Sequence, residues 1–122
     1  KDFRGGLLGH WAVWAHKAAE LLHKVKAYKA GNKQNAAEWL SKNVWVTDMN
    51  AAIFDPAHHF HGCIPGIHEV LRRQGLLKGI WCLNKEEVLS PGQADAITRV
   101  TQAYPELIDD DFVMTFLEKD RG

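Results

Sequence analysis

Apolar residues in the first quarter of the chain recur every three or four positions, which is the spacing of one face of an amphipathic α-helix. The run follows the Gly5-Gly6 turn and stops before Gly31, a residue suited to the left-handed position just after a helix. The pattern predicts a first helix whose buried face carries Trp11, Trp14, Ala15, Ala18, Leu21, Leu22, Val25 and Tyr28.

The helical pattern that follows is less regular. Residues 36–40 have helical spacing, but residues 43–46 (NVWV) favour a strand. Thr47 is suited to cap one or two further turns, which must end before Asp55 because a residue that precedes proline disfavours helical backbone. The pattern leaves open whether the helix continues through residues 43–46.

A third helix has clear signals at both ends. In IPGIHEVLRRQGLL, Pro65 suits the first turn of a helix, where its missing amide hydrogen costs no hydrogen bond. Gly75 suits the position just past the last turn, and Leu76 is placed to contact Leu71, as in a Schellman motif. We therefore predict a helix that begins near Pro65 and ends before Gly75.

Two further helices are predicted in the last third of the chain. Ser90-Pro91-Gly92-Gln93 forms a capping box for a helix that stops at Pro105, after the extended apolar connection of residues 79–89. The last helix has Asp109–Asp111 at its start and Lys119 at its end, an order that the helix dipole favours. Alternation with a period of two is nearly absent, so the chain is predicted to be mostly α, with about five helices.

The composition describes one ordinary domain without a strong charge preference. The chain has 122 residues, 46% of them hydrophobic, and 15 basic residues balance 15 acidic ones. General attraction to nucleic acid or to an anionic membrane is therefore not expected. No apolar run reaches the roughly 18 residues of a membrane span, and the first residues lack the pattern of a secretory signal. Two cysteines outside any CxxC pair predict a reduced, cytoplasmic location.

The densest cluster of reactive side chains comprises His58, His59, His61 and Cys63. Zinc binds such groups, but its sites usually combine two local pairs of ligands, and no second pair follows. His68 and Cys82 are the available distant ligands, and Phe60, which interrupts the cluster, is expected to be buried. A polar loop before the Pro65 helix is the favoured interpretation, and a metal site formed by His58, His61 and Cys63 is the alternative.

Other candidate chemistry is weaker. The start of the Pro65 helix could lower the pKa of Cys63 and make it a nucleophile, although both cysteines are typical of small buried residues. The HExxH, GxSxG, P-loop and GxGxxG motifs are absent from the sequence. A further alternative is a free-standing interaction module that binds a partner through the face carrying Trp11 and Trp14.

Residues 54–107 resemble the carboxy-terminal region of the dihydrodipicolinate synthase / N-acetylneuraminate lyase family. The family has a loop of the form Asn-Pro-Ile-Pro-Val-Lys, and Cys-Ile-Pro-Gly-Ile-His stands there in residues 63–68. Gln74-Gly75-Leu76 is similar to the family's turn at the end of the next helix, and Leu89-Ser90-Pro91 to the start of its last helix. The segment RGGLLGHWAVWAHKAAELL resembles the family's final barrel strand as it passes into a helix.

The resemblance implies a (β/α)8 barrel followed by a helical domain, in a lyase that forms a Schiff base between a lysine and pyruvate or another 2-oxo acid, without a cofactor. The family's strand-borne lysine, its proton-shuttling tyrosine and its Gly-x-x-Gly-Glu turn have no match in this sequence. Residues 1–10 are then expected to end a barrel strand, and residues 11–122 to form the carboxy-terminal helical domain, which is not itself catalytic.

The resemblance also implies partners and a location for the substrate. The rest of the barrel and sister subunits are the expected protein partners, and a small 2-oxo acid is the expected substrate of the intact protein. The rim of the substrate pocket is expected to include Gly6, Leu8, His58, His59 and His61.

Overall fold

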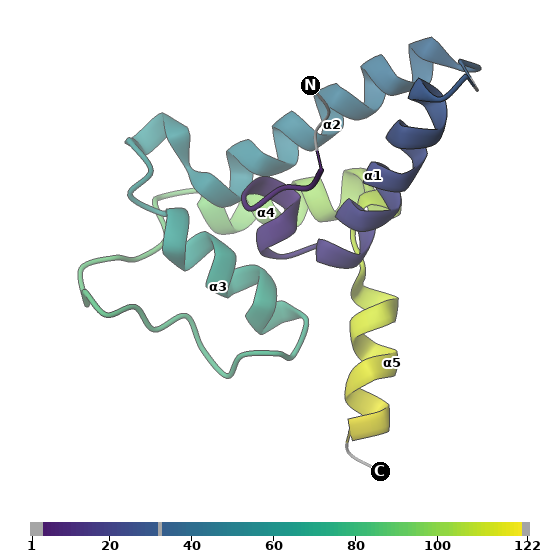
Figure 1. Ribbon diagram of the computed structural model, residues 1–122. Helices are drawn as coiled ribbons and strands as arrows, with labels where there is room; N and C mark the ends of the chain where they lie inside the picture. Colours follow the sequence, from purple (N-terminus) through teal and green to yellow (C-terminus); the bar gives the residue numbers. More distant parts are fainter. Residues whose placement is uncertain (1–3, 32, 121–122) are drawn as a thin grey trace.

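The computed structural model describes residues 4–31 and 33–120, which form five α-helices and no strand (Figure 1). This confirms the mostly α prediction for the described part of the chain. The helices are α1 (Ala15–Lys29), α2 (Ala36–Phe54), α3 (Cys63–Arg73), α4 (Gln93–Ala103) and α5 (Asp110–Asp120). Three short 3-10 helices accompany them: η1 (Gly9–Ala12), η2 (Pro56–His58) and η3 (Pro105–Leu107).

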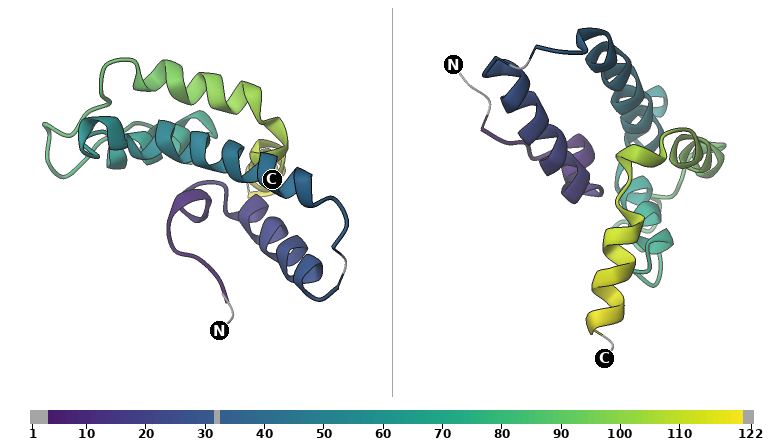
Figure 2. Two further views of the ribbon diagram at one scale, coloured as in Figure 1. Left: turned by 90° about the horizontal axis from the view of Figure 1, so that it is seen from above. Right: turned by 90° about the vertical axis from the view of Figure 1, so that its right-hand side faces the viewer.

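Helix α2 is the centre of the fold. It packs against α3 and α4, and it lies between α1 and α4 (Figure 2). Its buried positions Met49, Ala52 and Ile53 join a core whose other members come from the segment between η1 and α1 and from α3, α4 and η3. Those members are Val13, Trp14, Val70, Ile97, Val100 and Leu107.

Residues 43–46, whose sequence favours a strand, are helical and lie in the middle of α2. Residues 43–46 continue the helix without a break, although β-branched residues there lose side-chain freedom. Trp45 stacks on Tyr104 with ring centroids 5.7 Å apart, and this packing outweighs the weak local preference. Thr47 does not cap a turn: its hydroxyl donates to the carbonyl of Asn43 one turn earlier.

The first helix begins later than its apolar pattern predicts. Residues 9–12 form η1, and α1 begins only at Ala15. Trp14 is completely buried and Trp11 is half-buried. A surface on which both tryptophans bind a partner is therefore excluded, because Trp14 already packs in the core. The predicted end of a barrel strand at residues 1–10 stays a prediction: residues 1–3 lie outside the described part, and residues 4–8 form no regular element.

Helix α3 ends in the predicted Schellman motif. The amide of Leu76 donates to the carbonyl of Leu71 at 2.9 Å, and that of Gly75 donates to Arg72 at 3.0 Å. Gly75 has a φ of +81°, which glycine adopts without strain. The helix begins at Cys63, two residues before the proline that predicted its first turn.

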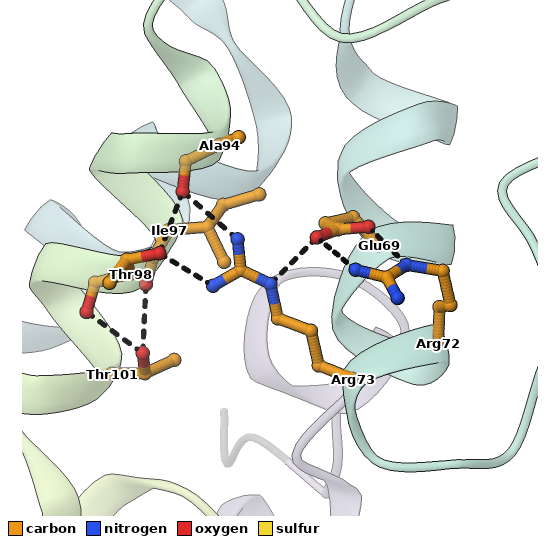
Figure 3. A network of polar contacts seen from close by, with 7 residues as sticks. All are labelled: Glu69, Arg72, Arg73, Ala94, Ile97, Thr98 and Thr101. Carbon is orange, nitrogen blue, oxygen red and sulfur yellow. Dashed lines mark hydrogen bonds and ion pairs between the residues drawn. The ribbon is translucent and has the colours of Figure 1, made fainter.

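Charged side chains connect α3 to α4 (Figure 3). The carboxylate of Glu69 receives hydrogen bonds from Arg72 and Arg73, which lower its pKa to about 2. Arg73 also reaches across to α4, where it donates to Thr98 Oγ1 at 2.8 Å and to the carbonyl of Ala94 at 3.1 Å. Arg73 therefore bridges the two helices while it pairs with a buried acid.

Helix α5 extends away from the other four helices (Figures 1 and 2). Its base is fixed by Gln74, whose side-chain amide donates to Asp109 at 2.9 Å and to Asp110 at 2.8 Å. The ring of Phe112 stacks on His16, with centroids 4.1 Å apart. Acidic residues occupy its first turn and Lys119 its last, as predicted.

Candidate functional site

Two segments about fifty positions apart in the sequence line one hollow on the surface. Leu8 and Gly9 form one wall, and Phe60 and Cys63 form another. The hollow has a volume of about 490 Å³, within the range of small-molecule sites, and most of its lining side chains are apolar. The remaining lining residues are Thr47, Asn50, Ala51, Phe54 and Pro56, all from α2 and η2.

The wall formed by Leu8 and Gly9 is held against α2 by a polar contact. His10 Nδ1 lies 3.3 Å from Asn50 Oδ1, and a Cβ on Gly9 would come within 3.1 Å of the amide nitrogen of Asn50. Gly9 also has a φ of +65°. Both the close approach and the left-handed backbone therefore favour glycine at this position.

The wall formed by Phe60 and Cys63 is organised around Asp55. Its Oδ1 lies 2.7 Å from His58 Nδ1, while its Oδ2 accepts hydrogen bonds from the amide of Gly62 at 3.0 Å and from Ser90 Oγ at 2.5 Å. Burial acts to raise the pKa of Asp55, but the hydrogen bonds from Ser90, His58 and Gly62 outweigh it, and the pKa is lowered. The carboxylate therefore stays ionised. It holds the loop between α2 and α3, residues 55–62, to Ser90 just before α4.

Gln93 fixes the same loop from the other side. Its amide nitrogen donates to the carbonyl of Gly62 at 2.9 Å, and its carbonyl oxygen accepts from the amide of Ser90 at 3.0 Å. The second contact is one half of the predicted capping box. The other half is missing, because the Ser90 hydroxyl donates to Asp55 instead of to the helix.

The backbone of the loop is strained where it turns. Asp55, His59 and Phe60 have φ values of +56°, +53° and +62°, in the left-handed region that non-glycine residues rarely adopt. Such strain persists where surrounding contacts determine the conformation, and it is concentrated at functional sites. The turn presents Phe60 to the hollow with 60% of its surface exposed, so the expectation that Phe60 is buried was wrong.

The residues expected at the pocket rim divide into two groups. Leu8 lines the hollow, and His58 supports the opposite wall through Asp55. Gly6, His59 and His61 are exposed and do not line the hollow. Phe60, Asp55 and Gln93 are the additional residues that shape it, and the only sequence signal for them was their position beside the histidine cluster and the capping box.

The metal alternative gains no support from the geometry. Within residues 4–31 and 33–120, no group of three histidine, cysteine, aspartate or glutamate side chains is placed to hold a metal ion. His58 pairs with Asp55, and His68 Nδ1 lies 3.9 Å from Cys82 Sγ.

The surroundings of Cys63 in the cluster favour its neutral thiol. Burial, together with the charge of Glu87, raises the pKa of Cys63 above its ordinary value. The alternative in which the helix start lowers this pKa therefore gains no support, because burial disfavours the charged thiolate. Cys63 contributes a neutral, weakly polar surface to the hollow.

No family model, curated protein or solved structure matches this chain. The resemblance to the lyase family therefore rests on the order of the sequence motifs. Among the described residues, no helix combines the length and the apolar character that crossing a membrane requires.

Proposed function

We propose that this chain is the carboxy-terminal portion of a dihydrodipicolinate-synthase-like lyase, and that the intact protein acts on pyruvate or another 2-oxo acid through a lysine Schiff base. One observation supports the proposal beyond the motifs. The segment that resembles the end of the last barrel strand and the segment that resembles the family's Pro-Ile-Pro loop, residues 63–68, line the same hollow, through Leu8 and Cys63. A barrel mouth that lies over this hollow would account for both.

In this proposal the chain shapes the site and another part of the protein performs the chemistry. A Schiff-base lysine must present a neutral amine to the substrate. Lys42 is the buried lysine of α2, but its ammonium pairs with Glu38 and lies 5.5 Å from the ring centre of Trp39, away from the residues of the hollow. The role we assign to the chain is to supply an apolar wall and a rigid support at the mouth of the barrel.

Reductive trapping tests the proposal. Pyruvate and borohydride convert a Schiff base into a stable covalent adduct on the lysine, which mass spectrometry detects. We expect the adduct on the longer protein encoded by the upstream reading frame and not on residues 1–122 alone. An upstream frame without a barrel, or a longer protein that no 2-oxo acid labels, would overturn the proposal.

Two matched variants of the longer protein test the role of the hollow. Phe60 lines it, whereas Phe116 is similarly exposed on α5, far along the chain from its walls. We expect Phe60→Ala to raise KM for the 2-oxo acid or its partner and Phe116→Ala to leave KM unchanged. Equal kinetics for the two variants would remove the hollow from the substrate site even if the lysine is labelled.

A further inference from the structure

The hollow beside α2 offers no positive charge to a ligand. Among the described residues that line it there is no lysine, arginine or histidine. Its polar side chains serve mainly the protein itself: the Thr47 hydroxyl donates to the carbonyl of Asn43, and Asn50 Oδ1 lies 3.3 Å from His10 Nδ1. No described residue accepts a hydrogen bond from the amide nitrogen of Asn50, so this group is left as a donor for a ligand.

Negative charges lie behind the walls of the hollow. Asp55 stands in the chain between two residues that line it, and its lowered pKa keeps it ionised. Its partner His58 does not line the hollow. The charge of Glu87 acts on Cys63, another lining residue, and helps to raise the pKa of its thiol. A carboxylate that entered the hollow would lose water without gaining a cation, so the hollow disfavours anions.

Phe60 gives the hollow a fixed aromatic wall. Its amide donates to the carbonyl of Asp55 at 2.9 Å, and its carbonyl accepts from the amide of Cys63 at 3.1 Å, so the backbone that carries the ring is held on both sides. The ring is 60% exposed, and Leu8 on the other wall is 77% exposed. A wall that is already in place binds a flat apolar group without first losing backbone freedom. Aromatic rings stack on such a wall with an offset or edge to face.

We propose that the hollow binds a neutral aromatic ring, and that this ring belongs to the carbonyl compound that reacts with the 2-oxo acid. The identity of this ligand rests on the proposed function, whereas the preference for a neutral ring rests on the hollow alone. The 2-oxo acid carries a carboxylate, so another part of the longer protein binds it. The volume of about 490 Å³ is roughly three times that of a cavity that encloses benzene, which leaves room for a substituent that accepts from Asn50.

Binding to residues 1–122 tests the preference for a neutral ring, because every residue that lines the hollow lies in this chain. Benzyl alcohol and benzoate carry the same ring and differ in charge. Titrations followed by amide chemical shifts should give a dissociation constant of about 1–10 mM for benzyl alcohol, with the largest shifts at Leu8, Ala51 and Phe60. The constant for benzoate should be at least about tenfold higher. No binding of benzyl alcohol, or equal affinity for the two probes, would overturn the proposal.

Two phenylalanine variants test the aromatic wall. Phe60 and Phe116 are both more than half exposed, so we expect the chain to stay folded when either is replaced by alanine. Phe60→Ala should weaken the binding of benzyl alcohol about threefold to tenfold, because the ligand loses its stacking partner. Phe116→Ala, on α5, should leave the dissociation constant unchanged. Equal effects of the two substitutions would place the ligand outside the hollow and refute the proposal.

A new cation in the hollow tests the argument from charge. Ala51 lines the hollow at an exposed position of α2, so a lysine there adds a positive charge without disturbing the core. Ala51→Lys should strengthen the binding of benzoate at least about fivefold and make it tighter than that of benzyl alcohol. Ala37→Lys adds the same charge at an exposed position at the start of α2 and should leave the preference for benzyl alcohol intact. Loss of the preference in both variants, or in neither, would contradict the proposal.

Kinetics of the longer protein test which substrate carries the ring. With pyruvate and benzaldehyde, Phe60→Ala should raise KM for benzaldehyde about threefold to tenfold and leave KM for pyruvate unchanged. A rise in KM for pyruvate alone would overturn this assignment.

The binding and labelling experiments separate this inference from the proposed function. If residues 1–122 bind benzyl alcohol and borohydride with a 2-oxo acid does not label the longer protein, the proposed function fails and the hollow remains a site for a neutral ring. If the longer protein is labelled and residues 1–122 bind no benzyl alcohol, this inference alone fails.

Discussion

Arg99 of α4 grips Asp48 of α2 with two parallel hydrogen bonds, each 2.7 Å long. Tyr104 adds a third hydrogen bond to the same carboxylate at 2.8 Å. The hydrogen bond from Arg99, with that from Tyr104, lowers the pKa of Asp48 from 3.8 to about 2. A planar guanidinium that pairs with both carboxylate oxygens is the strongest form of surface ion pair.

The first prediction concerns this pair. Because Arg99 is more than half exposed, we expect Arg99→Ala to lower the free energy of unfolding by only about 0.5–1 kcal/mol. The pair stabilises the fold above pH 3.8, and this contribution is lost as the pH falls through about 2, where Asp48 is protonated in the folded state as well. Urea titrations of both proteins should therefore converge at the acid end. A difference that persists below pH 2 would show that Arg99 acts mainly through packing.

The second prediction concerns the buried acid of the loop. Asp55→Ala leaves Ser90 Oγ and the Gly62 amide without their partner and places alanine at a φ of +56°, so we expect a loss of about 2–4 kcal/mol. Ser90→Ala removes one of these hydrogen bonds and should cost about 1 kcal/mol. Chemical denaturation measures both losses. Equal losses would mean that Asp55 is not the centre of the network.

The third prediction uses three glycines as a graded series. A Cβ on Gly66 would lie 2.1 Å from the backbone oxygen of Ile53, and one on Gly62 would lie 1.9 Å from the side chain of Gln93. A Cβ on Gly5 would meet nothing within 4 Å. We expect alanine at Gly66 to cost about 3 kcal/mol or more, because backbone cannot move aside, with Gly62→Ala close behind and Gly5→Ala near zero. Thermal unfolding should rank the variants in that order.

The fourth prediction concerns pH. Burial lowers the pKa of His10 below 6.5, although the hydrogen bond to Asn50 and the charge of Asp109 partly oppose this shift. The unfolded chain therefore binds the proton more readily, so stability is greatest above pH 6.5 and falls as the pH drops from 6.5 to the folded pKa. His10→Gln should flatten this part of the stability profile, whereas His23→Gln, at an exposed position of α1, should not. Parallel profiles for all three proteins would refute the assignment.

The structural features that the sequence predicts correctly are those set by residues close together in the chain. The end of α3 was predictable because Leu71, Gly75 and Leu76 form its Schellman motif within six residues. The continuity of α2 was not, because it depends on Trp45 meeting Tyr104, almost sixty positions later. Local propensity favours a strand there, and only the packed partner decides otherwise.

At the candidate site, too, local sequence signals identified a segment but not the long-range contacts that shape it. The histidine cluster drew attention to the loop of residues 55–62, but the contacts that hold this loop come mainly from Asp55, Ser90 and Gln93. Asp55 and Ser90 meet across 35 positions, and Phe60 is exposed because the backbone turns in the left-handed region. Neither fact leaves a pattern in the sequence, since the first depends on a contact between distant segments and the second on the backbone of the turn.

Gln93 couples the end of α2 to the start of α4. Its amide nitrogen lies 3.3 Å and 3.4 Å from the carbonyl oxygens of Ala52 and Ile53, so the last turn of α2 is capped by a residue forty positions later. The end of that helix cannot be completed before α4 arrives. Amide hydrogens in the last turn of α2, the loop and the first turn of α4 should therefore exchange with solvent through one shared opening event, as a single cooperative unit.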